Sequence, residues 1–449
     1  MKKYEDIVHD IEQKLMNEPF ASGQKLPSVR AAALHYGCSV STVTRAYAEL
    51  ENRHLIYSIA QSGYYAVGKS RDASGSFENR IIDFASVSPD PGVFPFADFR
   101  HCLNRALDTY QHELFTCGDS LGLRTLRRQL VSHLANDQVF ANEERIIVTP
   151  GANRALEILA KMPFPSGSSV VLVEQPSYDL YLRFLEAENI PVRGIARTTA
   201  GIDLEELEKA FKHGGIKFFY TMPRYHSPLG ASYSVNQRKA IAQLASRYGV
   251  YIVEDDYMAD LGDEPGAYPL YAYNETSHVA YVKSFSKIIF PGLRIGAVVL
   301  PEKLMQPFSE YKRYADTSQL SQAALEMYMR NGMYDRHKRK ISSQYAERLH
   351  VLHTALHMHG TEGMMGAADV RTGVYLPLPL PRTVNLERLT DRLAAKGIQV
   401  VSGKSFYLST WLEREKFLRI SVARARTVQI EEGVREIVRE VRRELGSLT

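Results

Sequence analysis

The stretch Ser284–Gly296 of this 449-residue chain places a lysine, Lys287, after two serines and before an arginine. A carboxylate, Asp255, stands 32 residues upstream in the run Glu254–Tyr257. A lysine amine condenses with an aldehyde to give a Schiff base. A guanidinium fork and hydroxyls suit a phosphate dianion, and a carboxylate suits a protonated ring nitrogen. These side-chain types are the ones that an aldehyde cofactor with a phosphate group needs.

The same residues resemble the cofactor site of fold-type I aminotransferases, which hold pyridoxal 5′-phosphate (PLP). The resemblance makes Lys287 the Schiff-base residue and Asp255 the partner of the pyridinium nitrogen. It makes Arg294, Ser284 and Ser286 the ligands of the cofactor phosphate.

Helical and strand patterns alternate along the large C-terminal part of the chain, which predicts an α/β domain with a largely parallel sheet. The expected strands are Arg145–Thr149, Ser169–Glu174, Lys217–Thr221, Val250–Glu254, His278–Lys283 and Gly296–Leu300. Amphipathic helices are expected at Ala152–Ala160, Leu180–Ala187 and Asn236–Arg247. Ligand groups are expected at the carboxyl ends of the strands.

Further candidate cofactor ligands follow these strands. Gly151, Ala152 and Asn153 open a helix, whose free amides suit a phosphate. By the resemblance, Tyr178 stacks on the cofactor ring and Tyr257 reaches its phenolate oxygen; core packing is the alternative for Tyr178. A lone lysine or aspartate at a strand end is usually a solvated surface residue, but matching chemistry at four strand ends argues against that interpretation.

Two positions depart from the family pattern. Ser227 stands where Pro-x-x-x-Asn-Pro-x-Gly has its asparagine, whose contact with the cofactor phenolate the Ser227 hydroxyl replaces weakly or not at all. Cys117 stands where relatives usually have a tyrosine that reaches the partner subunit's phosphate. We therefore expect a site that binds cofactor with at most partial transamination activity. Arg419, in Phe417–Ala423, resembles the arginine that grips a substrate α-carboxylate; a surface ion pair is the alternative.

The first 68 residues predict a different module. A helix over Tyr4–Met16 carries an apolar stripe, a second helix runs through His35, Gly37 breaks it, and a third helix begins at Ser39 and reaches Leu50. Tyr57–Ala60 and Tyr64–Val67 then read as a β-hairpin with Ser62-Gly63 at its turn. Three helices and a wing form a winged helix-turn-helix, and the run Leu26–Val67 resembles the DNA-binding domain of GntR-type regulators.

Hydroxyl and arginine side chains dominate the expected DNA-contacting surface. The candidates are Ser28, Arg30, Ser39, Ser41, Thr42, Thr44 and Arg45. Ser28 and Ser39 also suit helix N-caps, and Val40 stands where related regulators often carry an arginine. Residues 1–68 hold seven Lys/Arg and seven Asp/Glu. Because phosphate neutralisation supplies most non-specific affinity, we expect modest non-specific DNA binding.

The two modules in this order resemble the MocR subfamily of GntR-type regulators, in which the aminotransferase-like domain senses rather than metabolises. We expect a winged helix over residues 1–68, a polar linker over 69–80, and a PLP-binding effector and dimerisation domain over 81–449. The implied partners are operator DNA, a second copy of the chain, and an amino acid, an amine or PLP itself as effector. An active aminotransferase with an attached DNA-binding module is the alternative, and a regulator without a cofactor is a third.

Composition agrees with a globular protein, at 45% hydrophobic and 24% charged residues. No apolar run approaches the ~18 residues of a membrane helix, and Glu5, Asp6 and Asp10 interrupt any signal-like start. The three cysteines form no CxxC pair, and no metal site is expected. We expect a cytoplasmic protein that associates with the nucleoid when bound to DNA.

Overall fold

The computed structural model describes residues 3–17, 24–52, 55–59, 63–66, 81–262, 268–273, 277–360 and 373–446. The chain divides into two compact units, Met1–Ile81 and Ile82–Thr449, which are described separately. The expected linker over residues 69–80 lies outside the described residues. None of the helices among the described residues is long and apolar enough to cross a membrane.

The N-terminal unit contains three helices and a hairpin. These are α1 (Lys3–Asn17), α2 (Val29–His35), α3 (Val40–Asn52), β1 (Ile56–Ile59) and β2 (Gly63–Ala66). The Ser28 side chain caps α2 by accepting from the Ala31 amide, and Gly37 follows at a positive φ of 56°. The stripe predicted for α1 is buried at Ile7, Val8 and Ile11, in one core with Val43 and Tyr47 of α3.

The hairpin pairs antiparallel, but its glycine is not at the turn. Ile59 pairs with Gly63 and Ile56 pairs with Ala66, so Gly63 is the first residue of β2. Gly63 of the expected Ser62-Gly63 turn is therefore a strand residue, and Ser62, with the rest of residues 60–62, lies outside the described residues. Gly63 has a φ of 115°, which explains why glycine is suited to that strand position.

The second unit is built on an eight-stranded sheet in the order β4-β11-β10-β9-β8-β5-β6-β7. Its strands are β4 (Ile146–Thr149), β5 (Val170–Gln175), β6 (Val192–Thr198), β7 (Gly201–Ile202), β8 (Ile216–Thr221), β9 (Tyr251–Asp255), β10 (Val279–Ser284) and β11 (Gly296–Val299). The neighbours β10, β9, β8, β5 and β6 run parallel, whereas β11 is antiparallel to both β10 and β4. The predicted strands lie within one residue of the observed ones at each end.

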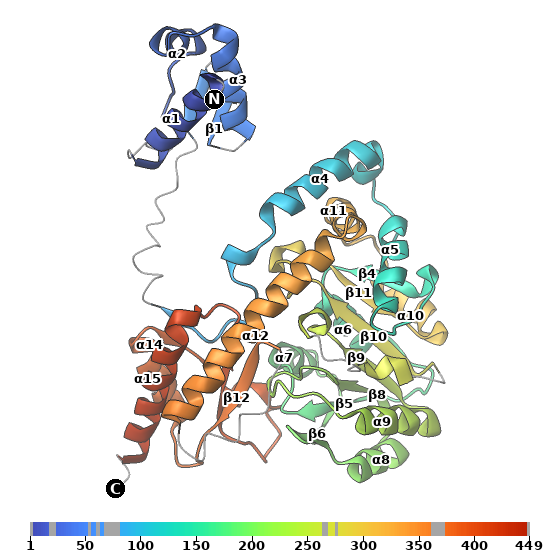
Figure 1. Ribbon diagram of the computed structural model, residues 1–449. Coiled ribbons are helices and arrows are strands. Elements are labelled where there is room, and N and C mark those ends of the chain that lie inside the picture. The colour runs from blue at the N-terminus through green and yellow to red at the C-terminus, as the bar shows by residue number, and fades with distance from the viewer. Residues whose placement is uncertain are drawn as a thin grey trace. The chain divides into compact units, whose positions relative to one another are not determined.

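Helices cover both faces of this sheet (Figure 1). The helices of this part of the unit are α4 (Phe96–Tyr110), α5 (Arg124–Ala135), α6 (Ala152–Lys161), α7 (Asp179–Ala187), α8 (Leu204–His213), α9 (Val235–Tyr248), α10 (Glu302–Lys312), α11 (Gln319–Arg330) and α12 (Met333–His359), and α4 packs on α11. Side chains alternate between the faces along each strand: Phe219 joins the core of one face, and Phe218 and Tyr220 join the other. Burial on both faces explains why these strands are almost continuously apolar.

The C-terminal part adds a smaller layer against helix α12 (Figure 1). It contains β12 (Tyr375–Pro379), α14 (Leu386–Ala395), β13 (Ile398–Gln399), β14 (Val401–Ser402), β15 (Phe417–Ser421) and α15 (Thr427–Gly446). Strand β15 lies between β12 and β14 and is antiparallel to both. β13 pairs in parallel with β3 (Ile82–Asp83), so the first described residues of this unit close against its last part.

The sheet order brings the predicted ligand-bearing strand ends to one edge. β5, β9 and β10 run parallel, and β4 runs in the same direction as β10 because both are antiparallel to β11. Their carboxyl ends therefore lie on the same side of the sheet, where ligand sites of parallel sheets form.

Candidate cofactor site and nucleic-acid interface

Lys287 lies in the turn that follows β10, directly before the buried pair Ile288 and Ile289. Its side chain is half-buried. Burial lowers the pKa of the Lys287 amine to about 8, and the positive charge of Arg419 acts in the same direction. Asp255 and Asp179 oppose the shift. A lysine whose pKa lies near neutrality keeps part of its amine unprotonated, which is the form that attacks an aldehyde.

Asp255 is the last residue of β9 and pairs with Val282 of β10. Its Oδ2 accepts a hydrogen bond of 2.9 Å from the Tyr220 hydroxyl. Its Oδ1 is buried and has no hydrogen-bond partner among the described residues. Burial raises the pKa of this carboxyl to about 7. A buried acceptor without a donor is what a pyridinium N–H would satisfy, so Asp255 fits that role.

A set of hydrogen-bond donors surrounds the start of α6. The helix begins at Ala152 without a side-chain cap, so its first-turn amides are available to an anion. The Arg294 guanidinium donates to the Pro150 carbonyl at 3.0 Å. A Cβ added to Gly151, whose φ is 86°, would lie 3.3 Å from Arg294 Nη2. Glycine at position 151 therefore leaves room for the Arg294 guanidinium and would let a phosphate come close to the backbone.

The two serines before Lys287 lie on the same turn. The Ser284 hydroxyl accepts from the Ser286 amide at 3.3 Å, and both side chains are half-buried. Asn153, in the first turn of α6, is half-buried beside the Tyr178 hydroxyl at 3.4 Å. Together with Arg294 and the α6 amides, this donor set fits a phosphate dianion.

Tyrosines line the same region. Tyr178 precedes α7, and burial raises the pKa of its hydroxyl to about 12. Tyr257 donates to the Tyr225 carbonyl at 3.1 Å and also bonds the Tyr375 hydroxyl. Ser227 is buried and hydrogen-bonds that same Tyr375. Tyr375 therefore joins two predicted site residues, although no pattern in the sequence singled it out.

Arg419, on β15, is buried between aromatic rings. Its guanidinium carbon lies 5.5 Å from the Tyr375 ring centre and 5.3 Å from that of Phe406. One Nη donates to the Ala85 carbonyl, whereas Nε has no partner among the described residues. No described carboxylate lies within ion-pair distance of it, and burial lowers its pKa. This geometry contradicts a surface ion pair and suits a carboxylate ligand.

A buried polar cluster next to Ser227 was not anticipated. Glu174, the penultimate residue of β5, accepts from the Met222 amide at 3.0 Å and from the Tyr233 hydroxyl at 2.5 Å. His226 Nε2 lies 3.2 Å from the same carboxylate. Although burial opposes ionisation, His226 and then Arg197 hold the pKa of Glu174 down to about 2. The cluster ties the segment that carries Ser227 to the sheet.

The sequence contains each member of that cluster but not their association. Glu174 and His226 are 52 positions apart and come together only because β5 and β8 are neighbours. A signal exists in retrospect, because an acidic residue that ends an apolar strand needs a buried partner.

In the N-terminal unit, the expected DNA-contacting side chains gather around α2 and α3. Ser39 accepts from the Thr42 amide at 3.2 Å, so it caps α3 as Ser28 caps α2. Thr44 donates to the Val40 carbonyl of its own helix at 2.9 Å. The Arg45 guanidinium lies 4.3 Å from the ring centre of Tyr4 on α1.

Most of this set faces solvent. Ser28, Arg30, Ser39, Ser41, Thr44 and Arg45 are exposed, and Thr42 is half-buried. Val40 is 51% exposed, so the position where related regulators carry an arginine is accessible here without a charge. A serine that caps a helix can still contact DNA, because the capping hydroxyl keeps a second lone pair and its own proton.

Comparison with known proteins matches both units. Residues 90–437 match the family Aminotransferase class I and II, and residues 3–65 match Bacterial regulatory proteins, gntR family. The chain is 45% identical to the uncharacterized HTH-type transcriptional regulator YcxD of Bacillus subtilis (strain 168), across 97% of this chain and 99% of that protein. It is 27% identical to the uncharacterized HTH-type transcriptional regulator YdcR of Escherichia coli (strain K12), across 94% and 95%.

Solved structures match the second unit. A multiple substrate aminotransferase from Thermococcus profundus superposes with a TM-score of 0.73 at 23% identity, covering 85% of this chain and 97% of that one. Pyrococcus horikoshii kynurenine aminotransferase gives a TM-score of 0.75 at 24% identity, covering 84% and 95%. At these identities the likeness establishes the aminotransferase fold and no substrate.

Proposed function

The chain belongs to the MocR-type regulators, in which a GntR-family helix-turn-helix is fused to an aminotransferase class I and II domain, and we propose that it is a PLP-dependent sensor of an amino acid or amine. Ligand in the large unit shifts the protein between states that differ in operator affinity. A ligand does this only through its differential affinity for the two states.

Two unpartnered buried atoms, Asp255 Oδ1 and Arg419 Nε, carry this proposal. Both residues act electrostatically on Lys287. Bound PLP supplies an aldehyde that Lys287 can meet and a pyridinium ring that draws electrons from an attached amine. Asp255 holds the ring proton, and the α6 amides with Arg294 hold the phosphate. Arg419 would bind the carboxylate of a ligand and so turn the ligand's amine toward the cofactor aldehyde.

The winged helix supplies the DNA contact. Exposed hydroxyls and arginines on α2 and α3 meet the operator, with Arg30 and Arg45 as the charged contacts. We propose a homodimer built by the large unit, because a two-fold pair is the commonest closed assembly and two winged helices read two half-sites. Because this role requires access to operator DNA, we propose a cytoplasmic protein.

The test titrates PLP-loaded protein with single amino acids and amines. Visible absorbance reports the cofactor, and fluorescence anisotropy reports affinity for DNA from upstream of the protein's own gene. We expect at least one ligand to change both signals, and the response to a carboxylate ligand to disappear in Arg419→Ala. The exposed Arg382→Ala serves as the control. If no ligand changes DNA affinity, the sensor proposal fails.

A working aminotransferase is the second candidate, and it is favoured as well by Arg419, which acts electrostatically on Lys287 and has no carboxylate partner among the described residues. Steady-state transamination discriminates between the two. Turnover on the order of 1–10³ s⁻¹, the usual range for enzymes, would assign the large unit to catalysis. Ser227 and Cys117, in place of the expected asparagine and tyrosine, lead us to expect far slower turnover.

A further inference from the structure

A polar pocket lies apart from Lys287, where the end of α5 and the junction of α11 and α12 meet. Its volume is about 160 Å³. Its lining residues are Gln129, Ser132, His133, Asn136, Met329, Tyr334 and Asp335. None of the residues proposed for the cofactor or the effector carboxylate lines it.

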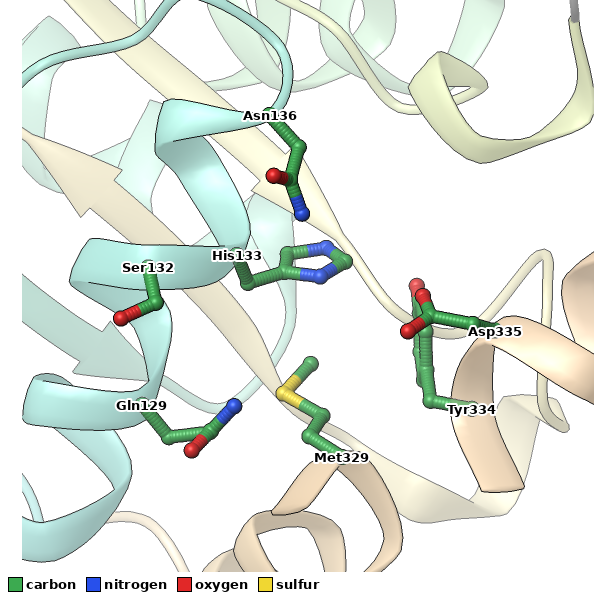
Figure 2. Close-up of a pocket in the computed structure, with 7 residues that line it drawn as sticks. All are labelled: Gln129, Ser132, His133, Asn136, Met329, Tyr334 and Asp335. Atoms are coloured by element: carbon green, nitrogen blue, oxygen red, sulfur yellow. The ribbon is translucent and has the colours of Figure 1, made fainter. Parts of the chain in front are cut away.

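Figure 2 shows how these side chains converge. The His133 ring projects from α5 toward the side of the pocket that carries Asp335 of α12, the amide of Asn136, the residue after α5, points toward that ring, and Met329 lies between the two helices. The pocket is therefore polar on opposite walls, with one apolar contact.

Most polar groups of the lining have no protein partner. The side chains of Gln129, Ser132, Asn136 and Asp335 make no hydrogen bond or ion pair with the described residues, and those of Ser132, Asn136 and Asp335 are exposed to solvent. His133 is 8% exposed, and its Nε2 has no hydrogen-bond partner among the residues that the structure describes. That nitrogen lies 3.7 Å from Asp260 Oδ1, which is also buried and without a hydrogen bond. Of these groups, His133 Nε2 and Asp260 Oδ1 are the buried ones, and buried polar atoms without partners call for a ligand or water to satisfy them.

The charge around the pocket is unbalanced. Asp260, behind His133, bonds Lys283 at 2.8 Å and lies 3.7 Å from Lys338. Asp137 and Asp335 add two carboxylates. Three carboxylates thus face two ammonium groups. Burial lowers the pKa of His133 to about 4, so the ring stays neutral near pH 7. One negative charge remains, and a neutral imidazole keeps one acceptor lone pair.

We propose that this pocket is a second ligand site, distinct from the cofactor site, for a compact ammonium compound of about six non-hydrogen atoms, since a cavity of about 150 Å³ holds benzene. The ammonium lies between Asp335 and the acceptors of His133 and Asn136, and the carbon skeleton lies on Met329. The inference is independent of the sensor function proposed above.

The probe is N,N-dimethylethanolamine, a tertiary amine that cannot form a Schiff base with PLP. Its neutral isostere, 3-methylbutan-1-ol, replaces the charged nitrogen with carbon. Ligand-observed NMR on the full-length PLP-loaded protein should show the amine binding with a dissociation constant on the order of 10 mM or tighter, a range reachable by so small a ligand. Equal binding of the alcohol, or no binding of the amine, overturns the proposal.

Variants locate the site. Asp335→Asn should weaken amine binding by about tenfold, the effect of losing one charge-assisted hydrogen bond. Glu347→Gln removes an exposed carboxylate from the same helix and should leave binding unchanged. Lys287→Ala should also bind the amine normally. Loss of binding in Lys287→Ala, or unchanged binding in Asp335→Asn, would show that the amine occupies another site, whatever the fate of the sensor proposal.

Discussion

The rate at which the cofactor-free protein captures PLP should depend on pH through the ionisation of Lys287. The charge of Arg419 should set the pH at which this rate has its inflection. Burial and the Arg419 charge lower the pKa of this amine from 10.5 to about 8. At pH 7 about one tenth of the amine is then neutral, against about one in three thousand for an unperturbed lysine. Capture of PLP by the cofactor-free protein should therefore be roughly 300-fold faster at pH 7 than with an ordinary lysine.

The perturbation is Arg419→Gln. Removing the positive charge relieves repulsion on the protonated amine, so the pKa of Lys287 rises and less neutral amine is present at pH 7. Asp255 and Asp179 also act on Lys287, and both favour the protonated form in wild type and variant alike. The variant should capture PLP more slowly near neutrality, and its rate should approach that of wild type above the ordinary lysine pKa.

Stopped-flow absorbance at a series of pH values measures this capture. Arg382→Gln, an exposed arginine that pairs with Glu415 at 3.5 Å, is the matched control and should follow the wild-type profile. An inflection that does not move in Arg419→Gln, or that moves downward, would refute the electrostatic reasoning. A rate that is lower by the same factor at every pH would indicate lost positioning instead of lost charge.

Further outcomes follow from the same geometry. Asp255→Asn should shift the visible band and weaken PLP binding by roughly 1.5–3 kcal/mol, the value of a charge-assisted hydrogen bond, as equilibrium dialysis would show. Gly296→Ala places a Cβ 2.6 Å from the Ala152 amide nitrogen, so the free energies of unfolding and of PLP binding should each become less favourable by about 1–3 kcal/mol. Thermal unfolding and PLP binding that match wild type would mean that the start of α6 moves aside at little cost. Arg45→Ala and Arg30→Ala should each lower the slope of log affinity against log salt by about 0.9 if each contacts one phosphate, with the visible spectrum unchanged. Sedimentation at micromolar concentration should give a dimer, and a PLP-loaded monomer would contradict the proposed assembly.

Much of the architecture is readable from local sequence. Apolar runs that end in Asp255 or Ser284 predict parallel strands, because a strand buried on both faces has no polar face. The helices of the N-terminal unit follow from the stripe at Ile7, Val8 and Ile11 and from the cap at Ser28. These features depend on neighbours along the chain, so their physics is visible in a single sequence.

Long-range pairing decided the rest. Only the fold buries Arg419 between Tyr375 and Phe406. A buried guanidinium with no carboxylate partner among the described residues can bind a ligand carboxylate, whereas a surface arginine is already solvated by water. Only the strand order brings Glu174 to His226. The shift of Gly63 from turn to strand shows the same limit at short range, because register depends on the partner strand. The residue types in the sequence determined which chemistry the chain can perform. Burial and long-range pairing determined which of those side chains have no partner within the described protein and are therefore available to bind a ligand.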